Sequence, residues 1–152
     1  MALDQQTELS RAETDAVLAR NETGVLSLAR GDEPYAIPIS YGYDAESRTV
    51  FLRLVSTPDS EKRAFLSSSP AVRLVVSEES PPEYRSVVAQ GTLTEISTDE
   101  MTVERIEQFG DAKRPLFEIW GADKPDLRIQ LYECDATTIS GRCIELDHAA
   151  YA

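Results

Sequence analysis

Histidine and cysteine are scarce in this chain, and their scarcity removes several kinds of chemistry. The 152 residues contain one histidine, His148, and two cysteines, Cys134 and Cys143. No further cysteine or histidine stands at the spacing that zinc ligands need, so we interpret the two cysteines as half-buried free thiols. One histidine leaves almost no residues for metal binding, haem binding or a catalytic triad based on histidine. We predict no metal site.

Long apolar runs and positive charge are also missing. The longest apolar stretches have about the length of a strand, far short of the roughly 20 residues of a membrane span. The polar, acidic start of the chain does not resemble a signal peptide, so we expect a cytoplasmic protein. Asp and Glu number 27 against 15 Lys and Arg, a net charge of −12, which repels nucleic acid and anionic membranes. We therefore expect neither as a partner.

Lysine is the scarcest of the charged residues, with three examples: Lys62, Lys113 and Lys124. An acidic surface that is poor in lysine is typical of proteins that work in molar salt, because salt screens the self-repulsion of the folded chain. We hypothesise a halophilic host cytoplasm. An acidic face for a basic partner is the alternative, and it fits less well because the acids are spread along the whole sequence.

The length fits one ordinary domain with a real core. No internal repeat, low-complexity segment or linker divides the chain. We expect a single domain over residues 1–146 and a flexible C-terminal tail over 147–152.

Capping and periodicity predict the order of the elements. Ser10 and Glu13 form a capping box, and several later segments alternate apolar and polar residues as strands do. The predicted helices are Ser10–Asn21, a segment from Thr57 that ends before Ser69, Ser97 to about Gly110, and a short turn over Pro115–Trp120. The predicted strands are Gly24–Arg30, Tyr35–Tyr43, Thr49–Val55, Ala71–Ser77, Tyr84–Ile96, Asp126–Cys134 and Ala136–Ile144, with a loop over Glu78–Glu83.

Short links between consecutive strands favour an antiparallel arrangement, and about seven such strands favour a closed or nearly closed barrel. Pro38 predicts an edge or a bulge, since proline cannot donate to a strand ladder. Gly91 predicts a bulge or a barrel corner. A barrel of this size fills its own interior, so a ligand would lie on the outer wall or at a subunit interface.

The segment from Arg53 to Lys62 is the best local candidate for an anion site. Arg53 ends a predicted strand, and the predicted helix start at Thr57–Ser60 offers free N–H groups and hydroxyls that favour phosphate. Lys62 adds a point charge. The alternative is that both cations are simply solvated, or paired with Asp59 and Glu61.

The order of elements resembles that of the flavin-binding split-barrel family of pyridoxamine 5′-phosphate oxidase and its relatives. Two pairs of segments and one single segment carry the resemblance, which extends from the first helix to the last strand. They are Ala36–Tyr41 with Thr49–Arg53, Ser60–Leu66 with Ser69–Val72, and Arg85–Gly91. They are similar to the family's proline-containing strand and its return strand, its "K-x-x-x-L" helix followed by "N-P-x-V", and its "S-V-x-[VI]-x-G" strand.

The resemblance implies a mainly β (α+β) fold: an antiparallel split β-barrel of about six to seven strands with two to four flanking helices. It also implies a homodimer with FMN in the subunit interface and a small-molecule substrate. Residues of the second copy, around Trp120 or Arg128, would complete the site. Within this chain it implies the following cofactor-binding residues: Lys62, Arg53 and Ser60 at the phosphate, Pro38, Ile39, Ser40, Tyr41, Leu52, Leu54 and Val55 along the ring and the ribityl chain, and Ser86 from the fifth predicted strand.

Departures from the family pattern reduce the number of activities that we expect. Glu61 stands where a phosphate-binding arginine is common, and the C-terminal arginine and histidine pair of the true oxidases is not recognisable, so we do not expect vitamin B6 synthesis. No pair of titratable groups is recognisable as acid and base, and the catalytic residues stay unknown. Tyr41 and Tyr43 could donate to a flavin or substrate carbonyl, although such tyrosines more often leave the hydroxyl in water.

These observations favour an FMN-dependent oxidoreductase acting on a small molecule. Three alternatives stay open: a reductase of the same fold that uses the deazaflavin F420, a non-enzymatic flavin store, sensor or scaffold, and a β-barrel without a cofactor. F420 would need more basic residues than this acidic chain offers, because its tail is polyanionic.

Salt tests the halophile hypothesis directly. Because screening relieves the repulsion among 27 acidic side chains, we expect the melting temperature to rise steadily from dilute buffer to molar KCl. Thermal melting followed by circular dichroism measures the effect. A melting temperature that does not change with KCl would contradict the hypothesis.

Overall fold

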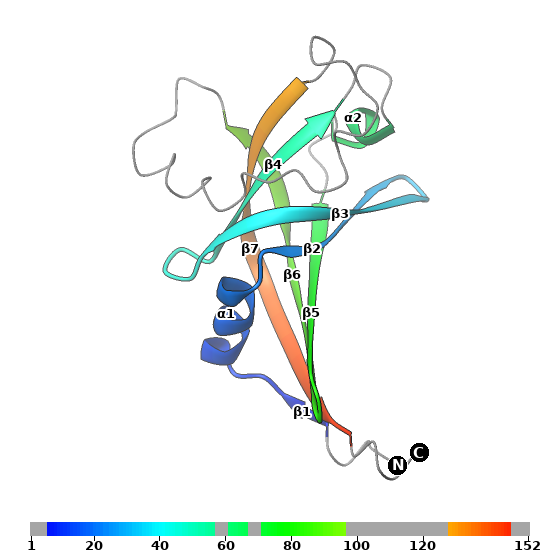
Figure 1. The fold of residues 1–152 in the computed structure, drawn as a ribbon. Helices are drawn as coiled ribbons and strands as arrows, with labels where there is room; N and C mark the ends of the chain where they lie inside the picture. The colour runs from blue at the N-terminus through cyan, green and yellow to red at the C-terminus, as the bar shows by residue number, and fades with distance from the viewer. Residues whose placement is uncertain (1–5, 57–60, 67–70, 97–127, 147–152) are drawn as a thin grey trace.

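The computed structural model describes residues 6–56, 61–66, 71–96 and 128–146, and these residues form two helices and seven strands (Figure 1). In chain order the elements are β1 (Gln6–Glu8), α1 (Arg11–Arg20), β2 (Thr23–Arg30), β3 (Glu33–Asp44), β4 (Thr49–Ser56), α2 (Glu61–Leu66), β5 (Ala71–Ser80), β6 (Glu83–Ile96) and β7 (Arg128–Glu145). The helices predicted over Ser97–Gly110 and Pro115–Trp120, the helix start at Thr57–Ser60 and the tail over 147–152 lie outside the described residues.

The strands form one antiparallel sheet that closes on itself. Its order is β1-β7-β4-β3-β2-β5-β6, and a further pairing of β6 with β7 joins the ends into a ring. The predicted mainly β antiparallel barrel is confirmed. Strand β1, which the polar start of the sequence did not indicate, pairs with the C-terminal end of β7 outside the ring.

Helix α1 begins where its capping box predicts. The Ser10 hydroxyl accepts a hydrogen bond from the Glu13 N–H at 3.2 Å, and the Glu13 carboxylate accepts one from the Ser10 N–H at 3.0 Å. The helix buries Thr14, Val17 and Leu18 against the barrel. Its apolar side therefore packs against β7, β3 and β6, and Figure 1 shows the helix beside β7 and next to β3.

Alternation along the strands fills the inside of the barrel. The largest fully buried side chains come from both helices and from β2 to β6: Tyr41, Phe65, Leu18, Leu26, Ile39, Leu52, Leu54, Val17, Val50, Val76 and Val87. Full burial of one such aliphatic or aromatic side chain stabilises the fold by about 1.5–3 kcal/mol. The barrel interior is therefore a packed core, as its size predicts.

Phe65 connects α2 to the β2–β3 hairpin. Its ring stacks on that of Tyr35 with the ring centroids 5.0 Å apart, and the Arg30 guanidinium lies 5.2 Å from the Phe65 centroid. Phe65 is 1% exposed. The short helix is therefore held by one deeply buried aromatic side chain.

Two sequence predictions about strand ends are wrong. The strands predicted over Asp126–Cys134 and Ala136–Ile144 are one continuous strand, β7. Asp135 does not turn the chain, because its carboxylate accepts a hydrogen bond from the Thr49 hydroxyl at 3.0 Å and the next N–H, that of Ala136, donates to the Arg48 carbonyl. Asp135 also pairs with Thr49 of β4 and Thr92 of β6, so it continues the strand between two neighbours.

The loop predicted over Glu78–Glu83 is a tight turn instead. Strand β5 continues to Ser80 and β6 begins at Glu83, so two prolines, Pro81 and Pro82, make the connection. Two consecutive prolines, which cannot donate to a strand ladder, made this segment look like a loop. In the structure, arginines from α1 and β6 bind Glu78 and keep the segment extended.

Both residues singled out as strand irregularities behave as predicted. Pro38 pairs with Val25 of β2, and within the described residues no strand is paired with its other side. The register of β6 against β7 shifts between Gln90 and Gly91, which is the predicted bulge. Among the described residues, no helix combines the length and the apolar character that a membrane crossing requires.

Gly91 leaves no room for a side chain. A Cβ atom there would lie 2.4 Å from the Asp135 carbonyl oxygen and 2.6 Å from the Cys134 sulfur. We expect Gly91→Ala to lower the free energy of unfolding by at least about 2 kcal/mol, because two backbones must move apart. Urea denaturation at a fixed KCl concentration measures the change.

Gly31→Asn is the matched control. Gly31 has φ 59°, which asparagine tolerates, and no atom lies within 4 Å of the position of an added Cβ. The control should cost less than about 1 kcal/mol. Equal losses in the two variants would show that the bulge does not require a glycine.

Candidate cofactor site

Strands β3 and β4 separate halfway along their length. They pair from Tyr41↔Leu52 to Asp44↔Thr49, and beyond Leu52 no pairing joins them in the described residues. The other half of β3 pairs with β2, while β4 continues beside β7. Figure 1 shows the two strands diverging, with α2 following the end of β4. We call this divergence the split.

The predicted cofactor residues of β3 and β4 lie on both sides of the split. Ile39 and Leu52 are 0% exposed and belong to the core, as do Tyr41 and Leu54. Their side chains therefore pack inside the barrel, and a ligand on the outside could contact only the main-chain groups of these residues. Strand edges that lack a partner strand present such groups, because each residue carries a donor and an acceptor.

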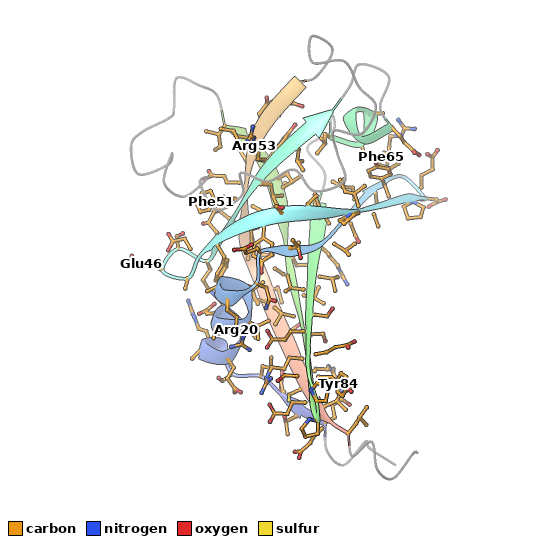
Figure 2. All side chains as sticks on the ribbon, in the orientation of Figure 1. Arg20, Glu46, Phe51, Arg53, Phe65 and Tyr84 are labelled. Atoms are coloured by element: carbon orange, nitrogen blue, oxygen red, sulfur yellow. The ribbon has the colours of Figure 1, made fainter. Side chains whose placement is uncertain are left out.

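The remaining residues of β3 and β4 differ in exposure. Pro38 is exposed on the outer surface, Ser40 is buried, and Arg53 is half-buried on the face of β4 opposite to Leu52 and Leu54. Figure 2 shows Arg53 near the end of β4, at the level of α2.

The rest of the predicted phosphate clasp is described in part. Lys62 is the second residue of α2, and Val55 is in β4, but their side chains lie outside what the structure describes. Ser60 lies outside the described residues altogether. The structure therefore places Arg53 in β4 and Lys62 in α2, the next element along the chain. Whether their side chains meet at a phosphate stays a prediction.

The hydroxyls of Tyr41 and Tyr43 donate hydrogen bonds to residues of helix α1. The Tyr41 hydroxyl donates to the Leu18 carbonyl at 2.7 Å, and that of Tyr43 donates to the Asp15 carboxylate at 2.6 Å. Burial raises the pKa of Tyr41, and burial together with the bond to Asp15 raises the pKa of Tyr43 to about 12. The suggestion that these hydroxyls face a flavin carbonyl or water is therefore wrong, since both anchor the helix.

Ser86 lies far from the clasp. Arg53 pairs with Leu131, and Leu131 pairs with Ile96 at the end of β6. Ser86 precedes Ile96 by ten residues, which is about 33 Å along the strand. Figure 2 shows the same separation, with Arg53 near one end of the barrel and Tyr84 near the other. The structure of one chain does not bring Ser86 and Arg53 together.

The sequence did not predict the cluster of charged side chains around Glu78, because Glu78 was expected in a loop. The Glu78 carboxylate accepts hydrogen bonds from Arg20 and Asn21, and Arg85 lies 3.8 Å away. The bond from Arg20 is the main cause that lowers the pKa of Glu78. Glu78, Arg20 and Arg85 line a groove of about 620 Å³ between α1 and the β5–β6 hairpin. With its charge satisfied, Glu78 is poorly suited to act as a general base.

The two cysteines are free, as expected, and differ in environment. Cys134 is buried and Cys143 is half-buried. Burial raises the pKa of the Cys134 thiol to about 11, so it stays protonated and unreactive near neutral pH. Within the described residues, no group of three or more metal-binding side chains gathers in one place.

The outer surface of β3, β2, β5, β6 and β7 carries two neighbouring rows of mostly uncharged side chains. We call these ten residues the outer patch: Pro38, Val25, Val75, Val88 and Ser140 in one row, and Ala36, Ser27, Arg73, Gln90 and Thr138 in the next. Val25, at 42% exposed, is the one large hydrophobic side chain classed as exposed among the described residues. The patch carries one charge among ten residues, a lower share than the 28% of the whole chain.

The family model of pyridoxamine 5′-phosphate oxidase matches residues 10–143. The chain belongs to this family. The match extends from the cap of α1 into the C-terminal half of β7, so it covers the closed barrel and both sides of the split. The resemblance inferred from the three sequence segments is confirmed.

Solved structures of the same fold come from several bacteria. An FAD-binding protein from Mesorhizobium loti is 23% identical with a TM-score of 0.70, and the match covers 91% of this chain and 97% of that one. A putative pyridoxamine 5′-phosphate oxidase from Corynebacterium glutamicum is 17% identical with a TM-score of 0.68, covering 94% and 96%. An FAD-binding protein from Mycobacterium smegmatis is 18% identical with a TM-score of 0.63, covering 93% and 100%. No curated protein matches the sequence.

Proposed function

We propose that the protein binds FMN between two copies of the chain and serves as a flavin-dependent oxidoreductase for a small molecule. The observation that carries the proposal is the family match over residues 10–143. Two structures of the same fold are described as FAD-binding proteins, which also favours a flavin. We do not extend the proposal to pyridoxamine phosphate itself.

The residues at the split fit a flavin that lies along it. The divergence of β3 and β4 leaves free strand edges at Pro38–Ser40 and Arg53–Val55, whose main-chain groups can bind the polar edge of the ring and the ribityl chain. The predicted residues Tyr41 and Leu52 pair with each other at the point where the strands part. The half-buried Arg53, with Lys62 and Ser60, would hold the phosphate. The flavin would supply the chemistry by carrying a hydride or electrons.

Ser86 can contact a flavin that is held by Arg53 only if the two residues belong to different copies of the chain. Ser86 and Arg53 are separated by most of the length of β6, so Ser86 of one copy would contact the flavin held by Arg53 of the other. The outer patch supports this arrangement, because its apolar row offers a surface that a second copy can cover without burying charge. Ser86 is exposed two residues before the patch residue Val88.

The proposal assigns binding and orientation to the protein, and no acid–base residue. The tyrosine hydroxyls nearest the split are bound to α1, and Glu78 is neutralised by arginines. Protein groups would thus fix the ring, hold the phosphate and exclude water, while the flavin determines the redox step.

The absorbance spectrum of the purified protein tests the proposal. Flavin maxima, with FMN identified by the mass of the released cofactor, support it. A single band near 400 nm would indicate a deazaflavin and contradict FMN, and released FAD would do the same. A colourless protein that cannot be reconstituted would overturn the flavin assignment. Bleaching by NADH or NADPH supports an enzyme, and its absence with every donor supports a flavin store.

The clasp is tested by Lys62→Ala and Arg53→Ala. Each removes a charge-assisted contact to phosphate worth about 1.5–3 kcal/mol, so we expect FMN to bind roughly 10–100-fold more weakly. Quenching of flavin fluorescence measures the affinity. Riboflavin, which has no phosphate, should lose almost nothing in the same variants.

Arg11→Gln is the control for charge alone, because Arg11 is exposed on α1, away from the split. It should bind FMN as the unaltered protein does. Unchanged affinity in both clasp variants would show that the phosphate lies elsewhere.

A further inference from the structure

A second groove opens on the outer wall of the barrel, within and beside the outer patch. It has a volume of about 420 Å³ and lies over β2, β5 and β6 at the bulge of β6. Its lining residues are Ser27, Leu28, Ala29, Ala71, Val72, Arg73, Gln90, Gly91, Thr92 and Thr137. Small side chains on three strands and the glycine at the bulge make the hollow.

The charge of this groove differs from that of the chain as a whole. Among the lining residues that the structure describes, Arg73 is the one charged residue and none is an acid, although the chain has 27 acidic residues. Four other described arginines, Arg20, Arg30, Arg48 and Arg85, each pair with a carboxylate. For Arg73 the described residues show no ion pair or hydrogen bond of the side chain, so an exposed guanidinium lies at a groove whose described lining contains no acid.

Neutral hydrogen-bonding groups surround the guanidinium. Ser27 and Gln90 are the direct neighbours of Arg73 on the two adjacent strands. Thr92 adds a hydroxyl, and the Thr137 hydroxyl donates to the Gln90 carbonyl at 3.2 Å, which fixes the bulge. A cation that binds planar oxyanions with two parallel hydrogen bonds therefore stands among hydroxyl and amide donors.

We propose that this groove is the subsite for an anionic group, a carboxylate or a phosphate, of the small molecule on which the flavin acts. The proposal rests on the proposed function. Arg73 is four residues from Ser77, and Ser77 is the strand partner of Ser86, so the groove lies about 13 Å along the sheet from the residue that would contact the flavin of the other copy. The substrate is then a small organic acid or phosphate ester, held by Arg73 with its reacting part toward the flavin.

Anion titrations of the full-length protein test the subsite. The ¹⁵N-labelled protein is titrated with inorganic phosphate and, separately, with acetate, at the lowest KCl concentration that keeps it folded and at constant ionic strength. We expect saturable shifts of the backbone amides of Ser27, Arg73, Gln90 and Thr92. In Arg73→Gln the affinity should fall at least tenfold, Arg73→Lys should restore part of it, and Arg11→Gln should bind as the unaltered protein does.

The outcomes separate the two anion chemistries and the two proposals. Saturation by acetate alone supports a carboxylate, saturation by phosphate alone supports a phosphate ester, and both together support a general oxyanion site. Shifts that do not saturate, or that persist unchanged in Arg73→Gln, overturn the subsite. FMN affinity is measured on the same samples and should not change in Arg73→Gln. If the unaltered protein binds the anion but no flavin, the proposed function fails, and the groove loses its assignment as a substrate subsite.

Discussion

The pairing of β7 with strands on both of its sides is the constraint on which the structure depends. Over its first half it lies between β4 and β6, and this closes the sheet into a ring. Closure requires the bulge at Gly91, where the backbones of β6 and β7 approach too closely for any side chain. Beyond Leu52, β4 continues beside β7 while β3 continues beside β2, so the split lies where the two strands take different partners, next to Pro38, which cannot donate to a strand ladder.

This geometry separates the two halves of the proposed site. Arg53 lies at the end where β4 leaves β3, whereas Ser86 and the outer patch lie on other strands of the same closed sheet. The barrel interior is filled, so the proposed flavin surface is external, and in the proposal a second copy completes it. The low charge of the outer patch is consistent with that role in a protein of net charge −12.

Local signals predicted most of the fold. The capping box at Ser10, the alternation in the strands, the edge at Pro38 and the bulge at Gly91 are short-range effects, and each is confirmed. The errors concern residues whose neighbours come from distant segments. Asp135 and Glu78 look like turn residues until Thr49 and Arg20 bind them, and the hydroxyls of Tyr41 and Tyr43 are fixed by α1. Likewise, no sequence pattern links Ser27, Arg73 and Gln90, which the sheet register places side by side.

A hybrid of two altered chains tests the central claim that each flavin is held by Arg53 and Lys62 of one copy and Ser86 of the other. One chain carries Arg53→Ala and Lys62→Ala, the other carries Ser86→Trp, and two different tags allow the mixed dimer to be purified. In the mixed dimer one site combines both defects, and the other is intact. The account predicts one FMN for each mixed dimer and almost none for either parent dimer. A mixed dimer without FMN would contradict it, because both defects would then act within single chains.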